Sequence, residues 1–191
     1  SVANRLPSDS HGNTHGAHDK PRKAGIMIVD DESYNVLVVR NFLQRAGHEK
    51  FVTTTESSQA IDLMKRDLPD IVLLDIMMPE VSGIDILRVM NITPELSTIP
   101  VIILTASLDP ALKTLALELG VTDFLAKPVD PSELVLRVKN VLAAKANFDM
   151  LAKYSVDLER QVAERTRALE ASRRHIIFCL ARASEFRDND T

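Results

Sequence analysis

The feature that most restricts the fold of this chain is a regular alternation of strand-like and helix-like segments between residues 25 and 143. Short runs rich in Ile, Val, Leu and Thr predict strands at 25–29, 50–54, 70–74, 99–105 and 123–126. Helically spaced apolar residues predict helices at 34–46, 57–67, 83–91, 110–119 and 131–143. This alternation predicts parallel strands joined by right-handed crossovers, with helices on both faces of the sheet. We therefore expect one doubly wound α/β domain over residues 25–144.

The third predicted strand ends in a carboxylate. In the stretch DIVLLDIMMPEVSG, residues 70–83, Asp75 directly follows Val72, Leu73 and Leu74, and turn-forming residues come next. A charge inside a strand that is buried on both faces would be costly, so Asp75 is expected at the carboxyl end of the strand. In open α/β sheets, ligands bind at this edge.

Three other predicted strands also end in polar residues. Asp30 and Asp31 follow the first strand, Thr105 ends the fourth and Lys127 follows the fifth. The carboxyl ends of parallel strands can meet at one edge of a sheet, so these side chains should converge with Asp75. Any one of them alone could be an ordinary solvated residue at a strand end. Five together, each at the appropriate end, predict a single pocket.

Such a pocket has a definite chemistry. Three carboxylates in close quarters repel one another unless a cation joins them, and oxygen ligands suit Mg²⁺, which leaves room for a phosphate. We therefore expect Asp30 and Asp31 to hold Mg²⁺. Asp75 would attack a phosphoryl group, Lys127 would neutralise negative charge, and the Thr105 hydroxyl would donate to a phosphoryl oxygen.

These residues and the motifs around them resemble the receiver domains of two-component response regulators. The resemblance covers about residues 25–144 and rests on VDDE (29–32), LLDIMMPEVSG (73–83), LTA (104–106) and KP (127–128). It implies a flavodoxin-like fold, in which a five-stranded parallel sheet has the strand order 2-1-3-4-5. It also implies a cis peptide bond within the KP pair.

The resemblance assigns roles to individual residues as well. It implies that a histidine kinase or phosphotransfer protein phosphorylates Asp75 in the cytoplasm. It also implies that Asp31, Asp75 and the Met77 carbonyl hold Mg²⁺. Phe124 matches the family's aromatic switch position, which turns inward as Thr105 moves toward the phosphoryl group. Phe124 could equally be a core aromatic residue, and the two interpretations are compatible.

Composition narrows the classes of partner. The 191-residue chain has a net charge of −4, and seventeen acidic residues face ten basic ones within residues 25–144. This balance argues against direct nucleic-acid binding through a basic face and permits a cation site. No apolar run approaches the roughly 20 residues needed to span a bilayer, so no membrane partner is expected. One cysteine, Cys179, excludes an internal disulfide framework and fits a reducing cytoplasm.

Residues 1–24 differ in composition from the rest of the chain. They are rich in Ser, Asn, His, Gly and Pro and lack apolar periodicity, so we expect a disordered arm. His11, His15 and His18 have spacings that could line a helix face for a metal ion. Two glycines interrupt that helix, so this metal site is not expected.

Residues 145–191 have no strand signals and no Gly or Pro. They contain an unbroken series of positions spaced by three and four, nine of the twelve apolar, and we call this series the seam. A seam this narrow on so long a helix predicts a coiled coil that makes a parallel homodimer, whereas a single solvated helix would not need it. The seam comprises Phe148, Leu151, Ser155, Leu158, Val162, Arg165, Leu169, Ser172, Ile176, Cys179, Ala183 and Phe186.

The segment 162–191 has a resemblance of its own. It is similar to the helical linker and opening residues of response regulators whose output domain is an HD-GYP cyclic-di-GMP phosphodiesterase. In that family the metal-binding histidines and the HD and GYP motifs come later. We therefore expect that this chain is truncated before its output domain. It would then be no enzyme, apart from self-phosphorylation and slow self-dephosphorylation.

Two other functions fit part of the pattern. A metal-dependent phosphatase or phosphotransferase of similar architecture would also use Asp75 as nucleophile. Such enzymes usually need a general acid nearby, and Met77, two residues further on, cannot transfer a proton. A degenerate receiver that serves only as a docking module would be expected to lack some member of the five-residue set, which is complete in this sequence.

Overall fold

The structure is a computed structural model that describes residues 23–106 and 109–188, with side chains described as far as Ile177. Five strands form one parallel sheet: β1 (Gly25–Val29), β2 (Lys50–Thr54), β3 (Ile71–Asp75), β4 (Val101–Thr105) and β5 (Asp123–Ala126). The helices between and after them are α1 (Ser33–Arg45), η1 (Ser57–Gln59), α2 (Ala60–Asp67), α3 (Gly83–Ile92), α4 (Pro110–Glu118) and α5 (Pro131–Asp188).

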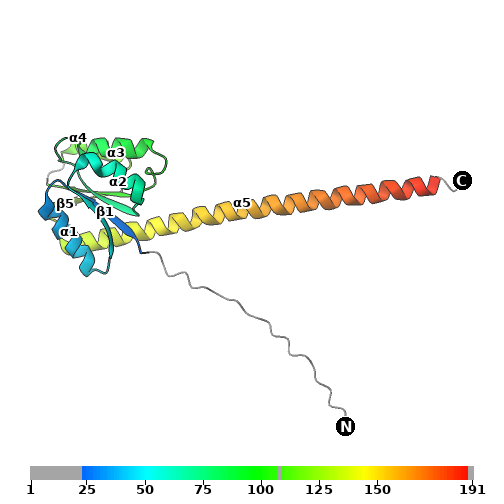
Figure 1. The fold of residues 1–191 in the computed structure, drawn as a ribbon, viewed down its shortest axis with the longest axis horizontal. Helices are drawn as coiled ribbons and strands as arrows, with labels where there is room; N and C mark the ends of the chain where they lie inside the picture. Colours follow the sequence, from blue (N-terminus) through cyan, green and yellow to red (C-terminus); the bar gives the residue numbers. More distant parts are fainter. Residues whose placement is uncertain (1–22, 107–108, 189–191) are drawn as a thin grey trace, which may run out of the picture.

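The order of the strands is β2-β1-β3-β4-β5, and every neighbouring pair is parallel. Helices α2, α3 and α4 cover one face of the sheet, while α1 and the first part of α5 cover the other (Figure 1). The prediction of a flavodoxin-like, doubly wound α/β fold with this strand order is therefore confirmed.

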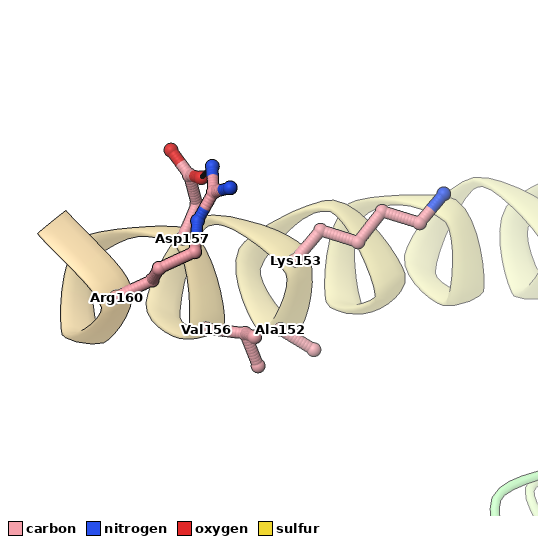
Figure 2. A pocket seen from close by; sticks show the side chains of 5 residues that line it. All are labelled: Ala152, Lys153, Val156, Asp157 and Arg160. Atoms are coloured by element: carbon pink, nitrogen blue, oxygen red, sulfur yellow. Dashed lines mark hydrogen bonds and ion pairs between the residues drawn. The ribbon is translucent and has the colours of Figure 1, made fainter.

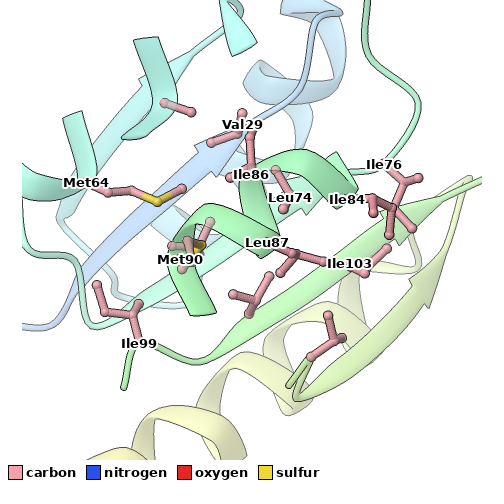
Figure 3. Close-up of a cluster of buried hydrophobic side chains, with 14 of the residues drawn as sticks. Val29, Met64, Leu74, Ile76, Ile84, Ile86, Leu87, Met90, Ile99 and Ile103 are labelled. Carbon is pink, nitrogen blue, oxygen red and sulfur yellow. The ribbon is translucent and has the colours of Figure 1, made fainter. Parts of the chain in front are cut away.

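Alternate residues of each central strand belong to two separate cores, because successive side chains of a strand point to opposite faces. On β3, Val72 and Leu74 pack with the α2–α4 face, and Ile71 and Leu73 pack with the α1–α5 face. Figure 3 shows the first of these cores, in which side chains from β1, α2, β3, α3 and β4 meet. Burial on both faces explains why the strand sequences are almost continuously apolar.

The ends of the elements follow local turn chemistry. Gly47 and Gly120 have φ of +95° and +85° and lie one residue beyond the caps of α1 and α4, where glycine is favoured. Leu68, at the end of α2, adopts φ of +42° although it is not glycine, and the sequence pattern did not predict this. The expected helix at 57–67 begins with the 3₁₀ turn η1 before α2.

Helix α5 is continuous from the helix expected at 131–143 into the expected coiled-coil segment, which confirms the prediction of a long C-terminal helix. No Gly or Pro follows Pro131 within it, so nothing in the sequence interrupts its backbone hydrogen bonds. Leu134, Val138 and Val141 bury its first turns against the sheet. Beyond Asp149 the helix projects away from the domain (Figure 1).

Some expectations fall outside the described part of the chain. Nearly all of the expected disordered arm, residues 1–24, lies there, and so do the side chains of Cys179, Ala183 and Phe186. Among the described residues, no helix combines the length and apolar character needed to cross a membrane.

Candidate functional site

Three carboxylates meet at the carboxyl edge of the sheet, as their positions after β1 and at the end of β3 predict. One oxygen from each of Asp30, Asp31 and Asp75 lies within 4.8 Å of the others. Asp30 and Asp75 are buried, at 0% and 5% exposure, while Asp31 remains accessible to solvent. Burying two acidic groups side by side is unfavourable unless they have partners.

Lys127 is the cationic partner of both buried carboxylates. Its Nζ donates to Oδ2 of Asp30 at 2.7 Å and to Oδ2 of Asp75 at 2.7 Å. Burial alone would lower the pKa of Lys127, but the hydrogen bonds and charges of the two aspartates outweigh burial and raise that pKa. Lys127 is therefore charged at neutral pH. The Lys127–Pro128 peptide bond is cis, as the family resemblance implies.

Backbone and amide donors hold the remaining oxygens of the two buried aspartates. Oδ1 of Asp30 accepts from the Glu32 N–H at 3.0 Å and from Nδ2 of Asn35 at 3.1 Å. Oδ1 of Asp75 accepts from the Met77 N–H at 3.2 Å. Asn35 was not among the predicted site residues, because a polar residue in the first turn of a helix gives no distinctive sequence signal.

The turn after β3 packs tightly against the backbone of Asp75. A Cβ atom added to Gly83 would lie 2.3 Å from the Asp75 carbonyl oxygen, so only glycine fits there. The Gly83 N–H donates to the Ile76 carbonyl at 3.0 Å and closes the turn. Met77 is 70% exposed beside this turn, so its apolar side chain faces solvent.

Thr105 and Phe124 lie on the two strands at the other side of the site. Thr105 ends β4 and is 2% exposed, one residue beyond the position that pairs with Asp75. Its carbonyl accepts from the Lys127 N–H at 2.8 Å, which ties the two strand ends together. Phe124 is partly buried against the α2–α4 core, and Nζ of Lys113 on α4 lies 5.7 Å from the centre of its ring.

The donor set fits a divalent cation. The cluster has three carboxylates, but the Lys127 ammonium group pairs with Asp30 and Asp75 alone, so two negative charges stay uncompensated within the cluster. Among the described residues, no hydrogen bond or ion pair holds the Asp31 carboxylate, which leaves its oxygens available as ligands. Oxygen ligands and partial access to solvent suit Mg²⁺, which keeps several of its waters.

Comparison with known families agrees with this geometry. Residues 26–139 match the response regulator receiver domain. A Vibrio cholerae protein named "Probable cyclic di-GMP phosphodiesterase" is 33% identical over 166 residues, which are 87% of this chain and 37% of that protein. Response regulator SaeR of Staphylococcus aureus is 43% identical over 123 residues, which are 64% of this chain and 52% of SaeR. The chain thus spans about half or less of the length of these relatives.

Solved structures give the same result. The crystal structure of a response regulator receiver domain protein from Clostridium thermocellum is 31% identical to this chain, with a TM-score of 0.59. The match covers 65% of this chain and 98% of the Clostridium chain. The signal receiver domain of a signal transduction histidine kinase from Syntrophus aciditrophicus is 30% identical, with a TM-score of 0.58. That match covers 63% of this chain and 91% of the Syntrophus chain. With the match over residues 26–139, these likenesses establish that the chain belongs to the response regulator receiver domain family.

Proposed function

We propose that this receiver takes a phosphoryl group on Asp75 from a histidine kinase or a phosphotransfer protein. The observation that carries the proposal is the pair of hydrogen bonds by which Nζ of Lys127 joins Asp75 to Asp30, beside the open Asp31 carboxylate. A carboxylate attacks a phosphoryl group well only where the charge on the transferring oxygens is neutralised. An ammonium group and a cation-binding cluster within hydrogen-bonding reach of Asp75 meet that need.

The proposed transfer replaces one bond to phosphorus with another. A carboxylate oxygen of Asp75 attacks the phosphorus of a phosphohistidine and forms an acyl phosphate. The P–N bond breaks, and its electron pair returns to the imidazole nitrogen, which takes up a proton from solvent. Lys127 moves its donor from Asp75 to a phosphoryl oxygen, while its second hydrogen bond, to Asp30, keeps it in place.

Mg²⁺ is the proposed cofactor, with Asp30, Asp31, Asp75 and the Met77 carbonyl as its ligands or close neighbours. Bound there, it would neutralise charge on the transferring phosphoryl oxygens. The three carboxylates supply the negative charge that holds it, and the Met77 N–H bond to Asp75 fixes the backbone next to the proposed carbonyl ligand.

Thr105 and Phe124 are the proposed switch. The buried Thr105 hydroxyl would donate to the new phosphoryl oxygens, and its movement toward them would open space beside β4 that Phe124 fills. Phe124 is partly buried against the α2–α4 core, in keeping with such a role. This movement would change the surface formed by α4 and β5 without unfolding either element.

Helix α5 is the proposed output connection. The match with the Vibrio cholerae relative covers more residues than the receiver family match, so it extends beyond the receiver. The apolar seam residues with described side chains, from Phe148 to Ile176, are each more than half exposed in a single chain. This exposure supports a parallel coiled-coil homodimer that joins two receivers to two output domains. We propose that the output is a cyclic-di-GMP phosphodiesterase, the activity in that relative's name.

One experiment separates this proposal from its alternatives: intact-mass spectrometry after incubation with acetyl phosphate and Mg²⁺. We expect one added phosphoryl group in the native chain and none in Asp75→Asn, which keeps the size of the side chain. Release of inorganic phosphate without an adduct would favour a phosphatase. Neither an adduct nor turnover would favour a docking module. An adduct of full yield on Asp75→Asn would overturn the assignment of the phosphorylated residue.

A further inference from the structure

Ser57 joins two loops that lie side by side at the site but are distant in sequence. Ser57 begins η1 after β2, and its side chain is buried, with the residue 5% exposed. Its Oγ donates to the Pro79 carbonyl at 2.9 Å and accepts from the Val81 N–H at 3.3 Å. One hydroxyl therefore contacts the loop between β3 and α3 on both sides of Glu80.

The backbone that Ser57 contacts is a tight, strained turn, in which the Val81 N–H also donates to the Pro79 carbonyl at 2.8 Å. Glu80 stands between the two contacted residues with φ of +65°, a conformation that is unfavourable for a residue with a side chain. The far end of the loop is fixed where Gly83 packs on Asp75. Met78 and Val81 pack the loop against the α2–α4 core, whereas Met77 and Glu80 are exposed. The two Ser57 bonds therefore add a polar fixing point on either side of the strained residue.

Ser57 is itself held from the end of β2. Oγ1 of Thr54 accepts from the Glu56 N–H at 3.0 Å and donates to the Glu56 carbonyl at 3.2 Å. These two bonds fix the turn that precedes Ser57 in the chain. The hydroxyl thus links the end of β2 to the β3–α3 loop.

We infer that Ser57 is a positioning residue that sets the β3–α3 loop, and with it the Met77 carbonyl, for metal binding at the phosphorylation site. The inference rests on the proposed function, because Met77 is a ligand only in that proposal. Ser57 touches neither Asp75 nor a phosphoryl group, and acts through the Pro79 and Val81 backbone. Its loss should weaken Mg²⁺ binding more than it slows phosphoryl transfer in the loaded protein.

The chain offers a matched control. Ser58 is the next residue, has the same side chain and is exposed, and its hydroxyl makes no hydrogen bond with the described part of the chain. Ser57→Ala and Ser58→Ala therefore remove the same atom from a buried bridge and from solvent. Ser57→Thr, which restores the hydroxyl, should recover most of the lost affinity, and Ser57→Gly is a second hydroxyl-free variant should Ser57→Ala fail to fold.

The measurements are Mg²⁺ affinity by titration calorimetry and, without metal, hydrogen exchange of the Met78, Glu80 and Val81 amides. We expect Ser57→Ala to bind Mg²⁺ about 3- to 10-fold more weakly, somewhat less than the loss typical of a group bonded directly to a metal ligand, and to exchange these amides faster. At saturating Mg²⁺, its phosphorylation by acetyl phosphate should return to within about twofold of the native rate.

Two results bear differently on the two proposals. Should Ser57→Ala bind Mg²⁺ as tightly as Ser58→Ala while only its melting temperature falls, Ser57 has a merely structural role and the inference is wrong. Should the native chain take up no phosphoryl group, the proposed function fails. The calorimetric comparison of the two serine variants still decides whether Ser57 sets the loop for metal binding.

Discussion

Nζ of Lys127 lies 2.7 Å from Oδ2 of Asp75, across 52 positions of the sequence, and the same nitrogen lies 2.7 Å from Oδ2 of Asp30. Both aspartates are buried, and 17% of the lysine side chain is exposed. The ammonium group therefore offsets much of the repulsion within the cluster in the metal-free protein, and it occupies the place where a phosphoryl group would need positive charge.

Replacing Lys127 with Met should destabilise the metal-free protein and should slow phosphorylation. Two buried carboxylates would lose their cation, so we expect the free energy of unfolding to fall by about 1–3 kcal/mol. Added Mg²⁺ should restore a large part of this loss, because it binds the folded cluster. Urea unfolding without and with Mg²⁺ measures the loss of stability and its recovery, and Lys139→Met, at an exposed lysine, is the control. Equal stability of the two variants without Mg²⁺ would show that the Lys127 bridge contributes nothing.

Position 77 should control the lifetime of the phosphoryl group. Hydrolysis needs a water molecule aligned opposite the leaving carboxylate, and the thioether of Met77 is at most a weak acceptor. Met77 is 70% exposed, so a polar side chain fits there without repacking. We expect Met77→Asn to shorten the half-life of the acyl phosphate several-fold, measured by mass spectrometry after removal of acetyl phosphate. An unchanged decay would exclude this position as the control point.

The sequence predicted the cluster because its members are tied to strand ends. Once Asp30, Asp75 and Lys127 are assigned to the carboxyl ends of parallel strands, the strand order brings them together, whatever the details of the loops. Asn35 and Ser57 were missed for the opposite reason. Their contacts depend on side-chain orientation and turn geometry in the loops and the first helical turns, where no apolar periodicity marks a position.

The ends of the helices and strands also include positions that the sequence predicts and positions that it does not. The left-handed conformations of Gly47 and Gly120 can be predicted from the sequence, since glycine adopts positive φ at little cost. Leu68 and Glu80 adopt it without such a signal in the sequence. The long helix α5 was predictable, because no Gly or Pro interrupts the chain after Pro131.

His48 should give the stability a small dependence on pH. Burial lowers the pKa of His48 below its ordinary value of 6.5, so the folded state binds this proton less readily than the unfolded state does. The contribution is complete above the unfolded pKa and is lost as the pH falls from 6.5 through the folded pKa. Between pH 7.5 and 5, His48→Gln should lose less stability than the native chain in urea unfolding. Identical losses would show that His48 does not titrate differently on folding.

The seam on α5 should make the protein a dimer, and Leu158 should be central to it. The described seam from Phe148 to Ile176 extends roughly 42 Å at 1.5 Å per residue, mostly beyond the receiver, so a second copy is the partner that can bury it along its length. Leu158 is 62% exposed in a single chain. Replacing it with Asp would place a carboxylate inside the helix pair, where it has no partner.

The same helix provides the control for this test. Val156 is 67% exposed, and lies with Ala152 on a side of α5 that also carries Lys153, Asp157 and Arg160 (Figure 2). It is two residues from Leu158, or about 200° around the helix, so it points away from the seam. In light scattering coupled to size exclusion, we expect dimers for the native chain and for Val156→Asp, and monomers for Leu158→Asp. A native chain that is monomeric at tens of micromolar, or equal dissociation by both substitutions, would require another role for the exposed apolar residues of α5.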